Sequence, residues 1–279
     1  MACFAGNGFS FPLGQKTYVM GILNVTPDSF LDGGRYFTPE KAAAHAQEME
    51  AAGADLIDIG AQSTRPGHTP RSAEEELSVL QTMLPAVRRA VSLPLSVDTF
   101  FPEVARYALA NGVSVVNDVS GVPSSEMAAV VRAFGAGWVL THTGGADAST
   151  PALYPKGVLE SVRAFFGTAL EFAGGQGISR EQLCLDPGFG FGKSADDDLT
   201  LLRGLSAVKS PDCALLAALS CKRMVARASG TAEADRLCGT IAADTLAIAG
   251  GADMIRVHHV KEAVAAAKFT DAALLRGGS

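Results

Sequence analysis

The sequence predicts an α/β protein that folds as a (β/α)8 barrel of the TIM type, with a short N-terminal hairpin. Short apolar runs alternate with amphipathic segments, and this alternation occurs eight times. The length of 279 residues is close to the ~250 residues typical of such barrels. Alternating strands and helices indicate a parallel sheet, and eight repeats favour its closure. No Pro/Ser-rich linker divides the chain, so we expect one domain over residues 1–279.

The predicted elements follow one another in a regular order. Residues 1–17 contain GNG and PLG turns and predict a hairpin or plug below the barrel. The apolar runs predict strands at 18–25, 55–60, 93–99, 114–121, 137–142, 182–188, 214–220 and 253–259. The first helix begins with Pro39 and ends before Gly53, and the second begins with the capping-box pair Ser72 and Glu75. These two helices span 39–52 and 72–91, and the others are expected at 101–111, 124–134, 156–173, 195–207, 235–249 and 260–274.

An open, doubly wound sheet is the competing architecture. It would need a loop such as GxGxxG after the first strand, where the sequence reads GILNVTPDSF. The stretch LDPGFGFGKS at 185–194 looks at first like a phosphate-binding P-loop. That loop needs two glycines separated by four residues, and the position required for the first one is Pro187. The barrel is therefore favoured, and these glycines must serve another purpose.

Composition and charge narrow the class of protein. The net charge of −6 argues against a general nucleic-acid binder, which carries a basic face. Five cysteines without CxxC spacing indicate free thiols in a reducing compartment. No apolar run of about 18 residues could span a membrane, and the N-terminus does not resemble a secretory signal. We expect a soluble cytoplasmic protein without nucleic-acid or membrane partners.

Polar residues stand at the end of every predicted strand, where barrel enzymes place their chemistry. A single residue of this kind could simply cap a helix or bind a loop, but eight that converge on one rim indicate a site. These strand-end residues are Asn24, Asp58, Asp98, Asn117, His142, Asp186, Ser220 with Lys222, and Arg256 with His258.

The chemistry of these side chains predicts two halves of a site. Asp98, Asn117 and Asp186 suit a flat heterocycle rich in N–H donors, because a carboxylate can accept two parallel hydrogen bonds. Arg256 and His258 follow the last strand, beside the usual phosphate site of barrels, and Arg65 and Lys222 add positive charge. Asn24 could orient a phosphate or a hydrated Mg²⁺. Phe191 could form an apolar wall, whereas Lys193 is interpreted as a helix-start or loop residue. The loops NVTPDSFLDGGRYFTPE and AQSTRPGHTPRS have the composition of binding lids.

The motifs GILNVTPDSFLDGG, STRPG, LDPGFGFGK and RVH occur in the order seen in dihydropteroate synthases, and the resemblance covers residues 18 to 265. It implies condensation of 6-hydroxymethyl-7,8-dihydropterin pyrophosphate with 4-aminobenzoate, which forms 7,8-dihydropteroate in folate biosynthesis. It also implies Mg²⁺ as cofactor, a homodimer, and sulfonamides as inhibitors.

The resemblance assigns roles to residues. Asp98, Asn117, Asp186 and Lys222 match pterin-binding positions, and Asn24, Arg256 and His258 match those for pyrophosphate and metal, with Asn24 at the metal. The positions around 4-aminobenzoate correspond to Thr64, Phe191 and Ser220, and the lid positions to Phe30, Asp32 and Arg65. Catalytic roles are implied for Asp32, Arg65 and Lys222.

Four positions depart from the family pattern, and three alternatives accompany the assignment. Gln62, Thr143, Cys221 and His259 replace the Glu, Met, Arg and Asp that are usual there. A pterin-dependent methyltransferase would share the barrel but would not need the two lid motifs. A non-catalytic pterin-binding barrel would bind without turnover, and Gln62 and Cys221 favour it. A metal hydrolase would use His142, His258 and His259, although the last two point to opposite faces of a strand.

Overall fold

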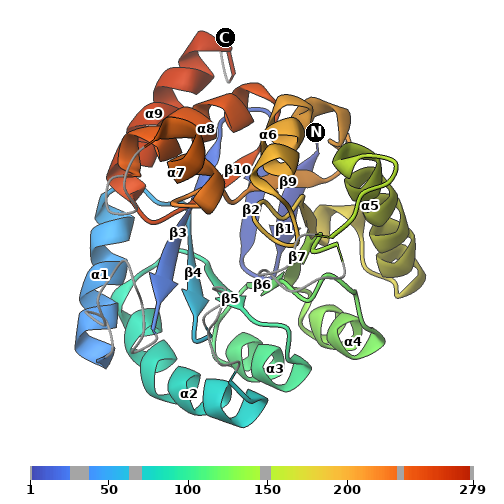
Figure 1. Cartoon of the computed structure of the whole chain (residues 1–279). Helices are drawn as coiled ribbons and strands as arrows, with labels where there is room; N and C mark the ends of the chain where they lie inside the picture. The colour runs from blue at the N-terminus through green and yellow to red at the C-terminus, as the bar shows by residue number, and fades with distance from the viewer. Residues whose placement is uncertain (1, 26–37, 63–70, 145–151, 231–235, 277–279) are drawn as a thin grey trace.

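The structure, a computed structural model, describes residues 2–25, 38–62, 71–144, 152–230 and 236–276. Eight strands of this part of the chain form a closed barrel, with helices packed around it (Figure 1). Around the barrel the strands follow the order β10-β3-β4-β5-β6-β7-β8-β9, and each described pairing is parallel. The predicted (β/α)8 fold is confirmed.

Each barrel strand lies within the range predicted for it. The strands are β3 Tyr18–Asn24, β4 Leu56–Gly60, β5 Leu95–Asp98, β6 Val115–Asp118, β7 Gly137–Thr141, β8 Leu183–Asp186, β9 Ala214–Ala217 and β10 Met254–Val257. Nearly all of their residues are buried. A parallel sheet covered on both faces requires this, which explains why the sequence shows continuous apolar runs instead of alternation.

The predicted helices are also present. They are α1 Pro39–Ala51, α2 Ala73–Ala90, α3 Pro102–Ala110, α4 Ser125–Phe134, α5 Val158–Gly175, α6 Ala195–Arg203, α8 Leu237–Ala249 and α9 Val260–Ala273, with short 3₁₀ turns at Arg180–Gln182 and Leu205–Ala207. The capping box at Ser72 and Glu75 forms as expected. One further helix, α7 Arg223–Ser229, was not predicted, and its N-cap Lys222 makes no side-chain capping bond.

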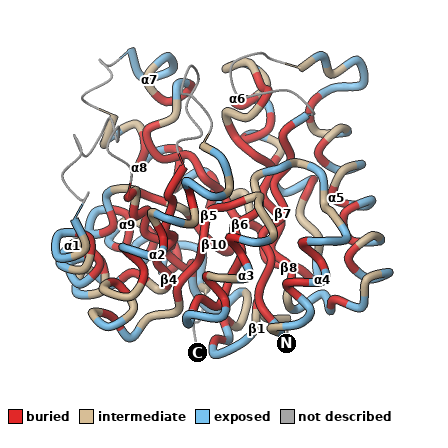
Figure 2. Tube along the Cα trace, turned by 90° about the horizontal axis from the view of Figure 1, so that it is seen from below, coloured by how far each residue is buried: buried red, intermediate tan, exposed pale blue. Residues whose placement is uncertain are grey.

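The N-terminal hairpin closes one end of the barrel. Strands β1 Cys3–Gly6 and β2 Phe9–Pro12 pair antiparallel, and Phe4, Phe9 and Phe11 are buried against the barrel interior. Phe11 stacks on Tyr18 of β3 with ring centroids 4.5 Å apart. Figure 2 shows β1 at the same end of the molecule as both labelled termini, and α6 and α7 at the opposite end. The carboxyl ends of the strands therefore carry the candidate site at the end away from this aromatic plug.

Two other expectations concern cysteines and membranes. All five cysteines are free thiols. Among the described residues, no helix has the length and apolar character needed to cross a membrane.

Candidate active site

Strand register brings four predicted or neighbouring residues to one level of the barrel. Asn24 is paired with Gly60, Gly60 with Asp98, and Asp98 with Asn117 across adjacent strands. Gly60 leaves room between its neighbours, because a Cβ there would lie 3.3 Å from Asn24 Oδ1 and 3.7 Å from Asp98 Cβ. The absence of a side chain at Gly60 thus lets Asn24 and Asp98 approach each other at the mouth of the barrel.

Arg256 links two buried carboxylates at this mouth. Its Nε donates to Asp58 Oδ2 at 2.7 Å, and its Nη2 donates to Asp98 Oδ2 at 2.9 Å. Asp58 Oδ2 also accepts a hydrogen bond from Asn117 Nδ2 at 2.9 Å. Asp58 is completely buried, and the Arg256 side chain is 15% exposed. Asp58 therefore holds Arg256 and Asn117 in fixed orientations beside Asp98.

The charges of this network are strongly coupled. Burial raises the pKa of Asp98 to about 7, and the attraction of Arg256 opposes this rise. Burial lowers the pKa of Arg256, but attraction to Asp58 and Asp98 outweighs it, so the net shift is upward. Arg256 therefore stays cationic, and its two carboxylate partners compensate its charge in the dry interior.

A tight turn orients Asp186 at the end of β8. The backbone N–H of Gly188 donates to Asp186 Oδ1 at 2.7 Å. Gly188 has φ +68, and a Cβ there would lie 2.0 Å from the carbonyl oxygen of His142. Glycine is required at this position because the turn needs a left-handed backbone packed directly against the end of β7. Burial raises the pKa of Asp186, while the Gly188 N–H and the charge of Lys222 lower it.

Lys222 joins the two halves of the site. Its Nζ lies 4.6 Å from the centroid of the Phe191 ring, which is a cation–π distance. Its positive charge also acts on both Asp98 and Asp186. Burial lowers the pKa of Lys222, and the attraction of Asp186 opposes this. The two predicted pterin carboxylates thus share one cation, with Phe191 beside it.

Ser220 and His258 meet at the ends of β9 and β10. Ser220 Oγ lies 2.9 Å from His258 Nδ1 and accepts a hydrogen bond from the His258 backbone N–H at 3.1 Å. The next residue, Cys221, has φ +57, and its N–H donates to Thr240 Oγ1 at 3.1 Å. Burial raises the pKa of Cys221, but hydrogen bonding with His259 and Ser220 outweighs it and lowers the pKa.

Two of the four departures from the family pattern therefore interact with each other, since Cys221 contacts His259. The other two are buried: Gln62 is 9% exposed and Thr143 is 6% exposed. Thr143 packs against Gly121, where a Cβ would lie 1.9 Å from Thr143 Oγ1.

The structure thus brings together most of the predicted site residues that it describes. Asp98, Asn117 and Arg256 share one network, Asp186, Phe191 and Lys222 adjoin it, and Ser220 bonds His258. The predicted residues Phe30, Asp32, Thr64 and Arg65 lie outside the described residues.

Two acidic residues gain importance that the sequence did not indicate. Asp58 was recognised as a strand-end residue without a role, yet it is the acceptor shared by Asn117 and Arg256. Glu76 of α2 is completely buried, and this burial raises its pKa to about 7. Its position in a capping-box helix rich in glutamate gave no signal of burial.

His142 is engaged in a way that argues against the metal-hydrolase alternative. Its Nδ1 lies 3.0 Å from Lys193 Nζ, and its Nε2 lies 3.1 Å from Ser161 Oγ. Both ring nitrogens therefore have protein partners. Among the described residues, no group of three His, Cys, Asp or Glu side chains is arranged to hold a metal ion.

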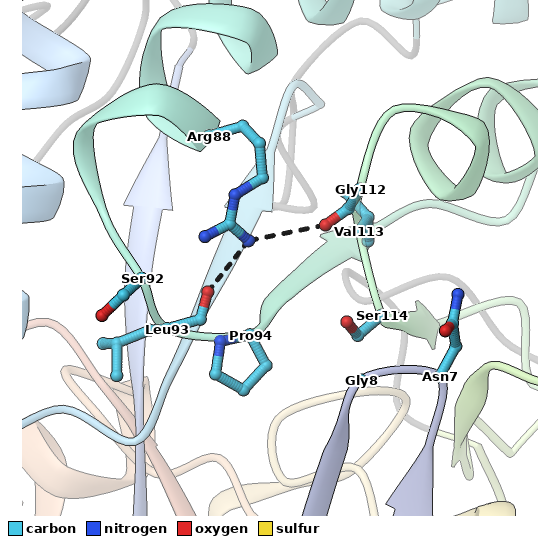
Figure 3. A pocket seen from close by; sticks show the side chains of 9 residues that line it. All are labelled: Asn7, Gly8, Arg88, Ser92, Leu93, Pro94, Gly112, Val113 and Ser114. Carbon is cyan, nitrogen blue, oxygen red and sulfur yellow. Dashed lines mark hydrogen bonds between the residues drawn. The ribbon is translucent and has the colours of Figure 1, made fainter.

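A pocket at the opposite end of the barrel lies apart from all predicted site residues. Its cavity volume is about 370 Å³, and its lining includes Gly8, Pro94 and Ser114 (Figure 3). Arg88 donates to the carbonyl oxygens of Leu93 at 3.0 Å and Gly112 at 3.5 Å. This face lies at the amino ends of the strands, where residues contribute to stability rather than catalysis.

Comparisons with known proteins agree with this geometry. Residues 20–258 match the family described as "Pterin binding enzyme". The dihydropteroate synthase of Synechocystis sp. is 40% identical over 94% of this chain and 92% of its own length, and that of Bacillus subtilis is 37% identical over 95% and 91%.

Solved structures show the same relationship. A Yersinia pestis dihydropteroate synthase with a sulfonamide drug complex superposes with a TM-score of 0.91 at 34% identity, covering 98% of this chain and 99% of that one. The Xanthomonas albilineans enzyme with 4-aminobenzoic acid superposes with a TM-score of 0.89 at 38% identity and with the same coverage of both chains. The chain therefore belongs to the dihydropteroate synthase family of pterin-binding enzymes.

Proposed function

We propose that this chain condenses 6-hydroxymethyl-7,8-dihydropterin pyrophosphate with 4-aminobenzoate, forming 7,8-dihydropteroate and pyrophosphate. One observation carries the proposal: three buried carboxylates and two cations converge at the carboxyl ends of the strands. They are Asp58, Asp98, Asp186, Lys222 and Arg256. This arrangement combines acceptors for a heterocycle with positive charge for a leaving anion. Sulfonamides, which mimic 4-aminobenzoate, are expected inhibitors.

The pterin ring would bind between Asp98, Asn117 and Asp186. An aminopyrimidine edge presents N–H donors, and these carboxylates and the Asn117 amide present matching acceptors. The Asn117 amide is held because its Nδ2 donates to Asp58, which directs its oxygen away from that bond. Asn117 Oδ1 is buried without a hydrogen-bond partner among the described residues, as expected of a group that awaits a ligand donor.

The reaction needs charge stabilisation more than covalent help from the protein. The arylamine nitrogen attacks the pterin methylene carbon while the bond from that carbon to the pyrophosphate oxygen breaks, and the amine then loses a proton. Arg256, His258 and Lys222 would stabilise negative charge on the leaving group, from positions fixed before the reaction. A side-chain nucleophile is unnecessary, so the cysteines take no covalent part.

Asn24 fits the requirement for a magnesium ligand. Asn24 is half-buried at the end of β3, where its Oδ1 and the Asp98 side chain both lie close to Gly60, and Mg²⁺ binds oxygen ligands while retaining several waters. Asn24 would hold the ion with the substrate phosphates, and the chemistry supplied by Mg²⁺ is neutralisation of pyrophosphate charge. Because Mg²⁺ needs more oxygen ligands than Asn24 supplies, we propose a site shared with substrate.

Pyrophosphate release tests the function. The complete mixture contains Mg²⁺, dihydropterin pyrophosphate and 4-aminobenzoate, and each is omitted in turn. We expect release that requires all three and yields dihydropteroate. We also expect Asp186→Asn to lower kcat/KM at least a hundredfold, while Asp196→Asn, an exposed aspartate of α6, stays within twofold. Pterin binding without release that depends on 4-aminobenzoate would instead support the non-catalytic alternative.

We further propose that the chain, as one domain over residues 1–279, works as a homodimer in the cytoplasm. Leu246 of α8 is 59% exposed and Phe269 of α9 is 75% exposed, and these neighbouring helices offer an apolar face to a second copy. The five free thiols suit a reducing compartment. Light scattering would give the mass, and Phe269→Glu should yield monomers; a monomeric wild type would refute the dimer.

A further inference from the structure

Lys193 is a buried cation that the reaction described above does not use. Only 3% of the Lys193 surface is exposed. Its Nζ lies 2.9 Å from the carbonyl oxygen of Gly188, 3.1 Å from that of Phe191 and 3.1 Å from that of His142. The fourth contact is His142 Nδ1 at 3.0 Å. An ammonium group has three N–H donors and no acceptor, so all of them are consumed by these four acceptors.

These contacts determine the state of His142. Because the ammonium group can only donate, His142 Nδ1 must accept and therefore carries no proton. The proton of the neutral ring is then on Nε2, which donates to Ser161 Oγ at 3.1 Å. Burial lowers the pKa of His142 to about 3, and the charge of Lys193 acts in the same direction. Lys193 thus ties the end of β7 and helix α5 to the turn after β8.

The turn at residues 188–191 carries groups of the candidate site. Gly188 donates its N–H to Asp186 Oδ1 at 2.7 Å, and the Phe191 ring lies 4.6 Å from Lys222 Nζ. The carbonyl oxygens of Gly188 and Phe191 are the ones that Lys193 holds. A shift of these carbonyls would move both the partner of Asp186 and the aromatic wall.

We propose that Lys193 is a positioning residue: its buried ammonium group holds the turn at residues 188–191 in the shape that presents Asp186 and Phe191 to the pterin. This inference rests on the proposed function, because the ligand of Asp186 is taken from it. The cation acts through the turn and does not touch the substrate. It thereby gives Lys193 a role beyond that of a loop residue.

The charges around Lys193 predict a pH dependence. Burial lowers the pKa of Lys193 to about 8. The charges of Asp198, Asp186 and Asp197 oppose this lowering, and the positive charge of Lys222 adds to it. Asp198 also accepts the Gly190 N–H at 2.9 Å, so it belongs to the same turn. Above the pKa, a neutral amine has two donors for the four acceptors. The turn should therefore loosen, and pterin affinity should fall, as the pH rises through about 8.

Lys193→Met removes the cation while keeping a chain of similar length. Calorimetry without 4-aminobenzoate would measure the Kd of dihydropterin pyrophosphate, and amide hydrogen exchange would report on the peptide covering residues 187–192. We expect the Kd to rise at least tenfold, exchange in this peptide to quicken, and the loss of affinity above pH 8 to disappear. Lys193→Gln keeps some hydrogen bonding, so its Kd and its exchange rate should lie between those of Lys193→Met and wild type.

Lys209→Met is the matched control. Lys209 is partly buried and donates to the carbonyl oxygen of Gly251 at 2.7 Å and to Asp253 at 2.8 Å. These partners directly precede β10, at the amino end of the barrel strands and away from the candidate site. Its loss should leave the pterin Kd within twofold. Equal Kd values and equal exchange for wild type and Lys193→Met would overturn the proposal, as would equal effects of the two lysine variants.

The histidine tautomer can be read in the unmodified protein, so the test survives if Lys193→Met fails to fold. Nitrogen-15 chemical shifts should show His142 neutral, with Nδ1 unprotonated, throughout pH 5.5–7.5, as its pKa of about 3 requires. A protonated Nδ1 in this range would overturn the proposal. Neither the tautomer nor the exchange rate depends on turnover, so an inactive wild type would count against the proposed function alone.

Discussion

Arg256→Met should strongly destabilise the fold, because it leaves the buried carboxylate of Asp58 without its cation and Asp98 with Lys222 alone. Arg256 bonds Asp58 at 2.7 Å and Asp98 at 2.9 Å. Asp58 has no exposed side-chain surface, and Asp98 has 10%. Methionine preserves much of the side-chain volume, so the main loss is electrostatic rather than steric.

The expected magnitude follows from this burial. Removal of one partner from a buried ion pair typically costs about 3–5 kcal/mol, because the other charge stays in a dry environment. Asp58 is the carboxylate that stays charged and fully buried, so we expect about 4 kcal/mol at pH 7.5. In an Asp58→Asn background, the same substitution should cost about 2 kcal/mol less, since one uncompensated charge has been removed.

Urea unfolding of wild type, both single variants and the double variant gives the four free energies of this cycle. Arg163→Met is the control, since Arg163 pairs with Glu160 at 3.6 Å with both side chains more than half exposed. Its loss should change the free energy of unfolding by less than about 1 kcal/mol. A cost below about 1 kcal/mol for Arg256→Met, or additive costs in the double variant, would refute the reasoning.

Two further predictions concern buried groups near the site. Burial raises the pKa of Glu76 from 4.5 to about 7. The contribution of protonated Glu76 to the free energy of unfolding is therefore fully present below pH 4.5. Roughly 3 kcal/mol of it is lost by the time the pH passes 7. Urea unfolding should show this loss relative to Glu76→Gln, and parallel stability curves would contradict it. For Cys221, whose lowered pKa depends on His259, iodoacetamide labelling should reach half its maximal rate below pH 9. His259→Ala should raise that midpoint, with exposed Cys238 as the internal reference; an unchanged midpoint would exclude the contact.

The elements of the barrel could be predicted because each produces a local pattern. An apolar run followed by a polar loop marks each strand, and signals such as Pro39 and the capping box at Ser72 mark helix starts. Helix α7 has neither signal: it is seven residues long, and Lys222 makes no side-chain cap. It contacts α6 and α8, and such contacts leave no local pattern in the sequence.

The connections within the site could not be predicted in the same way. Asp58 and Arg256 are 198 residues apart, and their pairing depends on barrel closure between β10 and β3. Lys193 is 51 residues from His142, and most of its partners are backbone carbonyls, which leave no trace in residue identity. Residue types at strand ends indicate that a site exists, whereas the ion pairs within it follow from distances in the folded chain.

The arrangement of charge suits the proposed binding and release of pyrophosphate. A free guanidinium in a dry barrel would hold pyrophosphate very tightly, because electrostatic attraction is strong where water is excluded. Two donors of Arg256 instead bond Asp58 and Asp98. These carboxylates fix the orientation of the guanidinium group and partly neutralise its charge. Because Arg256 is already oriented, no free energy is needed to reorient it when the bond to pyrophosphate breaks. We infer that Asp58 would serve turnover as well as stability: Asp58→Asn should slow pyrophosphate release more than it weakens pterin binding, and equal effects on both would contradict this.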